Sequence, residues 1–301
     1  IHEDRFSMND SIFDGMNNLT TIEYKKGITN MINGLSNYNH FSTDMLSKLT
    51  EIKINGQYCH LSSGVFSNMI NIERIEISSI SNITYIPSRC FEGCINLREI
   101  ILPSTIFSIE SKAFKNCINL RSFLIRKPET NSDDQKQKLK FIRKEAFYNC
   151  SALTSVTLPS SVYAICEGAF MNCMNLVNFE IETNKTNETD ESKESNETEE
   201  TELEIIEKNC FKNCKVLSSF HLPNSIKYVG PGAFMNCISM KEFEYKGSSL
   251  QSIESRTFYN CKSLSKIEFL NLSFNDSYIP IPDFESKENN DQKKNMILEN
   301  E

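Results

Sequence analysis

Apolar residues recur along this chain in a six-residue pattern, L-x-x-Φ-x-Φ, in which Φ stands for an apolar residue. Ten copies begin at Leu19, Leu49, Ile72, Leu97, Leu120, Leu153, Leu176, Leu217, Met240 and Leu264. The alternation in the second half of each copy is typical of a short β-strand with one buried face. The pattern therefore predicts ten short strands.

A second pattern, F-x-[N/G]-[C/M], precedes nine of these strands. Its third position is Gly15, Asn68, Gly93, Asn116, Asn149, Asn172, Asn213, Asn236 and Asn260. Asparagine and glycine are the residues that tolerate a positive φ best. We therefore expect a short helical turn, closed by a residue in the left-handed conformation, before each strand.

The shortest repeat is 23 residues, as from Phe91 to Phe114. One such unit is too small to bury its apolar face, whereas stacked units can bury it. The sequence therefore predicts a repeat solenoid over residues 1–284, with ten parallel strands on one sheet. Ten rungs at roughly 4.8 Å each would extend about 50 Å.

Two insertions and a polar tail interrupt or follow the repeats. The insertions, residues 126–139 and 182–202, both enter just after a strand, so we expect them at the same edge of the solenoid, clear of the sheet. They and the tail, residues 285–301, are rich in Asn, Ser, Thr, Glu and Lys. This composition is typical of disordered segments.

The units resemble the BspA-type leucine-rich repeat family. The resemblance rests on motifs such as Leu97–Ser104, LREIILPS, followed by Ala113–Cys117, AFKNC, and it covers about residues 13–269. It implies a right-handed β/α superhelix with a concave parallel sheet. It also implies a surface antigen or adhesin that binds other proteins, with no catalytic site to transfer. The degenerate repeat at Leu49 and the two insertions depart from the family pattern.

Cysteine fills the last position of the second pattern in seven repeats, and methionine fills it at Met16 and Met69. Methionine forms no disulfide, so we interpret the position as a buried apolar sulfur site and expect reduced thiols. Cys90 and Cys210 stand where other repeats have alanine. A zinc or redox site at C-x3-C is the alternative, although that spacing is unusual for a metal and no histidine lies nearby.

Catalytic and nucleic-acid-binding functions find no support in the residues. Histidines are scattered, and neither a nucleophile motif nor a phosphate-binding glycine loop occurs, so we expect no enzyme and no cofactor. The net charge is −8, and residues 182–202 alone contribute −7 (nine acidic residues and two lysines). The sequence has no basic stripe, which argues against nucleic acid. It also has no apolar run long enough to span a membrane.

Two settings remain open for a binding protein. A cell-surface or secreted adhesion module is favoured by the resemblance and by nine N-x-[S/T] sequons. Asn184, Asn187 and Asn196 are the best glycosylation candidates, and Asn149 should be too enclosed. An intracellular scaffold in the cytoplasm is favoured by the many cysteines that we expect to be unpaired.

A partner-binding surface is predicted on the outward face of the strands. In L-x-x-Φ-x-Φ the residue before each Φ should face solvent. These positions are mostly polar, but the central repeats have Ile101, Leu124 and Thr157, which lie beside Glu99, Ser122 and Ser155. An apolar patch rimmed by polar residues is typical of a docking site. Two other interpretations are ordinary β-propensity and a patch covered by the insertion 126–139.

Overall fold

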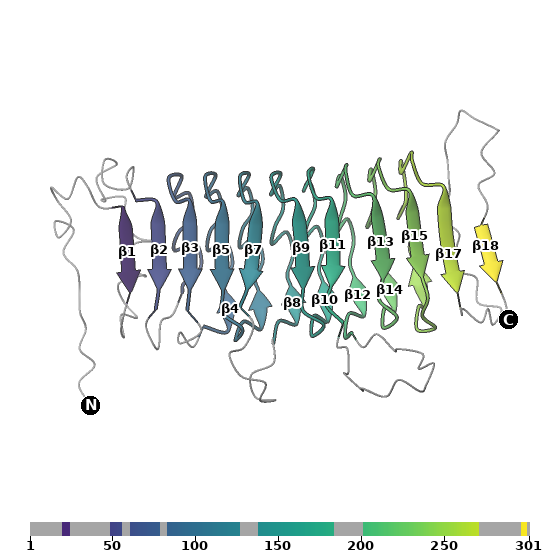
Figure 1. The fold of residues 1–301 in the computed structure, drawn as a ribbon, viewed down its shortest axis with the longest axis horizontal. Coiled ribbons are helices and arrows are strands. Elements are labelled where there is room, and N and C mark those ends of the chain that lie inside the picture. The colour runs from purple at the N-terminus through teal and green to yellow at the C-terminus, as the bar shows by residue number, and fades with distance from the viewer. Residues whose placement is uncertain are drawn as a thin grey trace, which may run out of the picture.

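The computed structural model describes residues 20–24, 49–55, 61–78, 83–126, 138–183, 201–270 and 296–299. Within these residues the chain winds into a stack of rungs, and the long strands lie side by side in sequence order (Figure 1). The predicted repeat solenoid is confirmed.

Ten strands begin two residues after the first position of each L-x-x-Φ-x-Φ copy. They are β1 (Thr21–Tyr24), β2 (Glu51–Ile54), β3 (Arg74–Ile77), β5 (Glu99–Leu102), β7 (Ser122–Ile125), β9 (Ser155–Leu158), β11 (Asn178–Ile181), β13 (Ser219–Leu222), β15 (Glu242–Tyr245) and β17 (Lys266–Leu270). All recorded pairings among them are parallel, and we call these strands the first sheet. The degenerate repeat at Leu49 forms its strand like the others.

The first sheet is not one continuous ladder, which corrects the prediction. Its ladders are β1-β2-β3-β5-β7, β11-β9 and β13-β15-β17-β18. Both breaks follow a strand that leads into an insertion, β7 or β11.

A second sheet of two-residue strands runs unbroken past both insertions. Its members are β4 (Tyr85–Ile86), β6 (Ser108–Ile109), β8 (Phe141–Ile142), β10 (Ala164–Ile165), β12 (Ile205–Ile206), β14 (Tyr228–Val229) and β16 (Ser252–Ile253). The second residue of each strand is buried in the core. In Figure 1 the labelled short strands lie near the lower ends of the long ones.

The F-x-[N/G]-C segments are hydrogen-bonded turns, and the described residues contain no α-helix, which corrects the expected β/α superhelix. The amides of Phe114 and Asn116 donate to Ala146 and Tyr148 in the next rung, at 2.8 and 2.9 Å. Because these amides are used between rungs, they are unavailable for helical bonds within one rung.

The left-handed conformation predicted for the turn is confirmed. The asparagines at the third position of the turn pattern have φ between 60° and 66° at Asn116, Asn149, Asn172, Asn213, Asn236 and Asn260, and Gly93 has φ 76°. A second left-handed position lies four residues earlier in each turn and was not predicted. It holds Gly64, Arg89, Lys112, Glu145, Gly168, Asn209, Gly232 and Arg256. Three glycines and one asparagine there were the signal in the sequence.

Stacked phenylalanines form the centre of the core. Neighbouring turn phenylalanines have ring centroids 5.1–5.9 Å apart from Phe66 to Phe258. This stack also runs past both insertions without a break. Seven cysteines end the F-x-[N/G]-C turns, and we call them the ladder cysteines: Cys94, Cys117, Cys150, Cys173, Cys214, Cys237 and Cys261. They are buried, as are Cys90 and Cys210, and none of the nine is in a disulfide.

The ends of both predicted insertions belong to rungs, which narrows their bounds. Leu139 is fully buried in the core, and Thr201 contacts Ser225 at 2.8 Å between hydroxyl oxygens. Residues 127–137 and 184–200, with Asn184, Asn187 and Asn196, lie outside the described residues.

Part of the tail predicted to be disordered is a strand, β18 (Met296–Glu299), which pairs in parallel with β17. An open sheet edge favours such pairing.

Candidate protein-binding surface on the first sheet

The outward positions of the first sheet are those predicted. In β2, β3 and β5 the first and third residues are partly exposed and the second and fourth are buried. The outer face therefore has two columns of side chains, one from the first and one from the third residue of each strand.

The structure brings four of the six predicted patch residues together. Ile101 lies beside Leu124, and Glu99 lies beside Ser122, because β5 and β7 pair in register. The Leu124 side chain is 51% exposed, the most of any large apolar residue in the described part of the chain, while Ile101 is half-buried. The exposed apolar surface at the centre of the face is thus real, and Leu124 is its main contributor.

The other two predicted residues lie across a ladder break. Thr157 and Ser155 belong to β9, which pairs with β11 and not with β7. Thr157 therefore lies in register with Glu180, and Ser155 with Asn178. The hydrogen-bonded ladder beneath the predicted patch is therefore interrupted between Leu124 and Thr157.

A charged cluster borders the patch on the side of β2 and β3. The Arg74 guanidinium contacts the carboxylates of Glu51 at 2.8 Å, Glu99 at 2.9 Å and Glu76 at 3.4 Å. The hydrogen bond from Arg74 is the main cause that lowers the pKa of Glu51. The bonds to Glu99 and Glu51 raise the pKa of Arg74. These contacts hold the rim in one arrangement beside Ile101.

Arg126, the first residue of the predicted insertion, also pairs with Glu76. The expectation that the insertion stays clear of the first sheet is therefore wrong for this residue. Sequence analysis missed both Arg126 and Arg74. The signal for Arg74 was present, because Glu51, Arg74 and Glu99 occupy one column with alternating charge.

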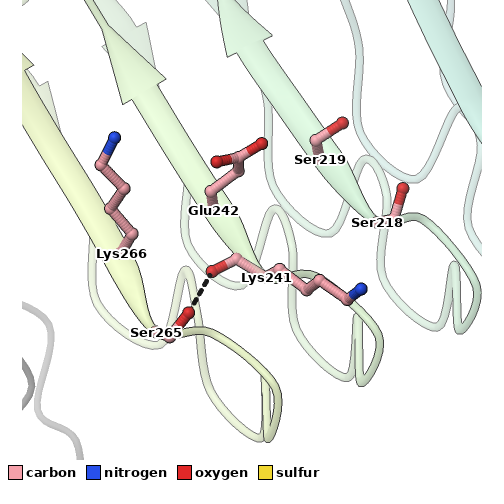
Figure 2. Close-up of a pocket in the computed structure, with 6 residues that line it drawn as sticks. All are labelled: Ser218, Ser219, Lys241, Glu242, Ser265 and Lys266. Carbon is pink, nitrogen blue, oxygen red and sulfur yellow. Dashed lines mark hydrogen bonds between the residues drawn. The ribbon is translucent and has the colours of Figure 1, made fainter.

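The face near its C-terminal end is more polar. Glu244 lies between His221 at 3.5 Å and Lys246 at 3.2 Å, and Lys266 contacts Glu268 at 2.8 Å. At the start of these strands a shallow depression is lined by Ser218, Ser219, Lys241, Glu242, Ser265 and Lys266 (Figure 2). The Ser265 hydroxyl donates to the Lys241 carbonyl at 3.1 Å.

The buried thiols are unsuited to nucleophilic chemistry. Burial raises the pKa of Cys173 to about 12 and that of Cys166 to about 11. A reactive thiol needs a lowered pKa and access to solvent. Among the described residues no three His, Cys, Asp or Glu side chains gather as metal ligands would. The same residues contain no helix with the length and apolarity of a membrane span.

Comparisons with known proteins agree with the repeat architecture. A family model described as the BspA type leucine rich repeat region, in six copies, matches residues 7–135, 130–197 and 191–285. No curated protein matches the sequence.

Several solved structures resemble the chain. A leucine rich repeat protein of T. pallidum is 21% identical, with a TM-score of 0.45, over 71% of this chain and 77% of that chain. A leucine rich cell surface protein of Faecalibacterium prausnitzii is 18% identical, with a TM-score of 0.37, over 83% of both chains. The pneumococcal vaccine antigen PcpA is 18% identical, with a TM-score of 0.32, over 73% of this chain and 67% of that chain.

Proposed function

Since this chain belongs to the BspA-type leucine-rich repeat family, we propose that it is a non-catalytic module that binds another protein through the outer face of its first sheet. The observation that carries the proposal is the exposed Leu124 beside Ile101, at the centre of a face that is otherwise polar. Protein-binding interfaces typically have an apolar core surrounded by a polar rim.

The geometry of the rim supports this assignment. Glu51, Glu76 and Glu99 all contact the Arg74 guanidinium, so the rim is ordered before a partner arrives. A preorganised rim costs less conformational entropy on binding than a mobile one. Glu99, Ser122 and the apolar pair then present charge, hydroxyl and apolar area within two adjacent strands. Thr157 and Ser155 would extend the contact across the ladder break.

We place the module at the cell surface or outside the cell, in keeping with its family resemblance. The test is binding to immobilised extracellular matrix proteins and to whole host cells. The Ile101→Glu/Leu124→Lys variant should lose saturable binding. His221→Glu/Glu244→Lys is the matched control, because these residues occupy the same column on adjacent strands. Undiminished binding by the first variant, with its fold intact, would remove the patch from the proposal.

An intracellular scaffold is the second candidate. It is favoured by the unbridged state of all ten cysteines in the described part of the chain, since secreted proteins usually pair their thiols. Mass spectrometry of cysteines in protein from its native source separates the two settings. Disulfides among Cys94, Cys117 and Cys150 would exclude the scaffold, and fully free thiols would favour it.

A further inference from the structure

The C-terminal edge of the first sheet is formed by a strand that does not belong to the repeat. β18 lies beyond β17 and is the last strand of the ladder β13-β15-β17-β18 (Figure 1). The repeat has an apolar residue two positions before each strand, whereas Lys294 occupies that position before β18. No copy of the turn pattern occurs between Cys261 and Met296. β18 therefore extends the sheet without forming a rung.

β18 joins the described fold through one of its edges. Among the strands of the structure it contacts β17 alone, and the two pair in parallel from Ile267–Met296 to Leu270–Glu299. A repeat strand such as β15 is paired on both sides. Strands β3 to β15 of the first sheet are each followed by a strand of the second sheet, but that sheet ends at β16. Pairing with the edge of β17 is thus the attachment that the structure shows for β18.

The core is covered less completely at this edge than inside the stack. Ile267 is half-buried, whereas Phe243, its neighbour in register on β15, is 1% exposed. Phe269 is 9% exposed, and its neighbour Tyr245 is fully buried. An added strand pairs the backbone groups of β17 beside these side chains. An open sheet edge of this kind is a template for a strand from another chain.

The connection between β17 and β18 is longer than the pairing requires. It consists of residues 271–295, which are 25 positions (295 − 270) outside the described residues. Neighbouring parallel strands need a crossover of about a dozen residues or more. The connection has about twice that length, so it does not oblige β18 to pair with the β17 of its own chain. A β18 from a second copy has the same sequence and would make the same contacts with β17.

We propose that two copies of this chain exchange β18, so that the β18 of each copy pairs with the β17 of the other. Reciprocal exchange of an identical element closes a symmetric dimer. Each edge has the same partner in the monomer and in the dimer, so concentration decides between them. A strand tethered by a flexible connection has an effective concentration on the order of millimolar. The monomer therefore prevails in dilute solution, and the dimer forms where copies are crowded.

The test shortens the connection in the full chain. Deleting residues 273–292 leaves five residues (25 − 20), too few for a parallel crossover, so β18 reaches only the β17 of a second copy. We expect a dimer at micromolar concentration by light scattering, with a dimer dissociation constant lowered by at least about tenfold relative to the original chain. Deleting residues 277–286 is the matched control, because 15 residues (25 − 10) remain and the crossover is still possible. This variant should stay monomeric at the same concentration.

Proline substitutions identify the strand responsible. Consecutive amides of a strand point to opposite sides, so one of Ile297 and Leu298 donates to β17, and Ile297→Pro/Leu298→Pro removes that donor. The dimer of the shortened chain should be lost in this variant. Asn300→Pro/Glu301→Pro is its control, because these residues follow the strand, and it should leave the dimer intact.

A second measurement uses the original chain and serves if the shortened chain loses its fold. An affinity-tagged copy should retain an untagged copy after the two are mixed near millimolar concentration. Retention should be lost in Ile297→Pro/Leu298→Pro.

Three outcomes overturn the proposal. One is a shortened chain that folds and remains monomeric. Another is the absence of retention between original copies near millimolar concentration. The third is a dimer that survives Ile297→Pro/Leu298→Pro, which would assign the contact to another surface. The edge of β17 is separate from the proposed site around Leu124, so Ile101→Glu/Leu124→Lys should leave the exchange unchanged, and failure of either proposal leaves the other intact.

Discussion

The thiol of Cys117 donates a hydrogen bond to the backbone carbonyl of Phe91 in the preceding rung, with 3.1 Å between sulfur and oxygen. The six other ladder cysteines make the same contact at 3.0–3.3 Å. Cysteine therefore does more than fill space at this position, because its S–H satisfies a buried carbonyl that an apolar side chain would leave without that donor.

These protonated thiols predict a loss of stability at alkaline pH. Burial raises the pKa of Cys94, Cys173 and Cys261 to about 12, whereas an unfolded cysteine titrates near pH 8.5. Between these values the unfolded chain binds fewer protons than the folded chain. The stabilisation is therefore complete below about pH 8.5 and is lost as pH rises toward 12. Each such thiol contributes up to about 1.4 kcal/mol per pH unit.

The measurement is the free energy of unfolding by urea between pH 8 and 11. The Cys150→Ala/Cys173→Ala variant should be less stable at neutral pH and should have a shallower decline above pH 9. Lysine and tyrosine also titrate in this range, so the comparison between the two proteins isolates the thiols. An identical slope in both would show that the thiols are not the cause.

Replacing Asn172 by valine should lower the free energy of unfolding by roughly 1–2 kcal/mol, because a β-branched residue is strained at positive φ. Asn172 has φ 66°, and its side-chain oxygen accepts a 2.6 Å bond from the Asn213 amide. Asn172→Gly is the control, because glycine keeps the left-handed backbone conformation and loses only the side-chain hydrogen bond with Asn213. The difference between the two variants in thermal or urea unfolding measures the backbone strain. A neutral valine variant would contradict the assignment.

Side-chain hydrogen bonds between the turn asparagines of neighbouring rungs also bear on glycosylation. The Asn149 side-chain amide donates to Asn116 at 3.1 Å, so the nitrogen that a glycan would occupy is already used. This contact supports the expectation that Asn149 stays unmodified even though its sequon is intact.

Deleting residues 184–200 should change the melting temperature by no more than a few degrees, because the free energy of loop closure varies slowly with length. The shortened chain would connect Ile181 to Leu203 through four residues, 182, 183, 201 and 202. Three other rungs make this corner with three residues, namely 103–105, 159–161 and 223–225. Calorimetry is the measurement. Removing Thr201 and Glu202 as well should cost more, since Thr201 contacts Ser225 and Glu202 pairs with Lys140.

Amide exchange should reveal the two breaks in the first sheet. The amides of Val177 and Lys241 donate to the preceding rung at 2.8 Å. Thr154 and Ser218 occupy the equivalent positions after the breaks, and among the described residues neither makes that bond. We expect hydrogen exchange at Thr154 and Ser218 to be faster by an order of magnitude or more. Equal protection at all four amides would mean that the ladder is continuous in solution.

The repeat register was readable from the sequence because each rung reuses one solution for burying its apolar face. Leu97, Ile100 and Leu102 belong to one copy, and all three are fully buried. The left-handed residue of the turn was readable for a similar local reason, since Asn116 and its counterparts satisfy a backbone requirement that few residues meet. Local patterning of this kind depends on neighbours within one rung, which the sequence contains.

Contacts between rungs required the tertiary structure. The sequence did not indicate that the backbone amides of Phe114 and Asn116 donate hydrogen bonds to the next rung. These bonds link the turns of neighbouring rungs and take the place of the helical hydrogen bonds that we expected within one turn. It also did not indicate the break in the hydrogen-bonded ladder between the strands of Leu124 and Thr157, because that break depends on how strands pair after an insertion. Only the stacking of rungs, which joins residues more than twenty positions apart, determines these contacts.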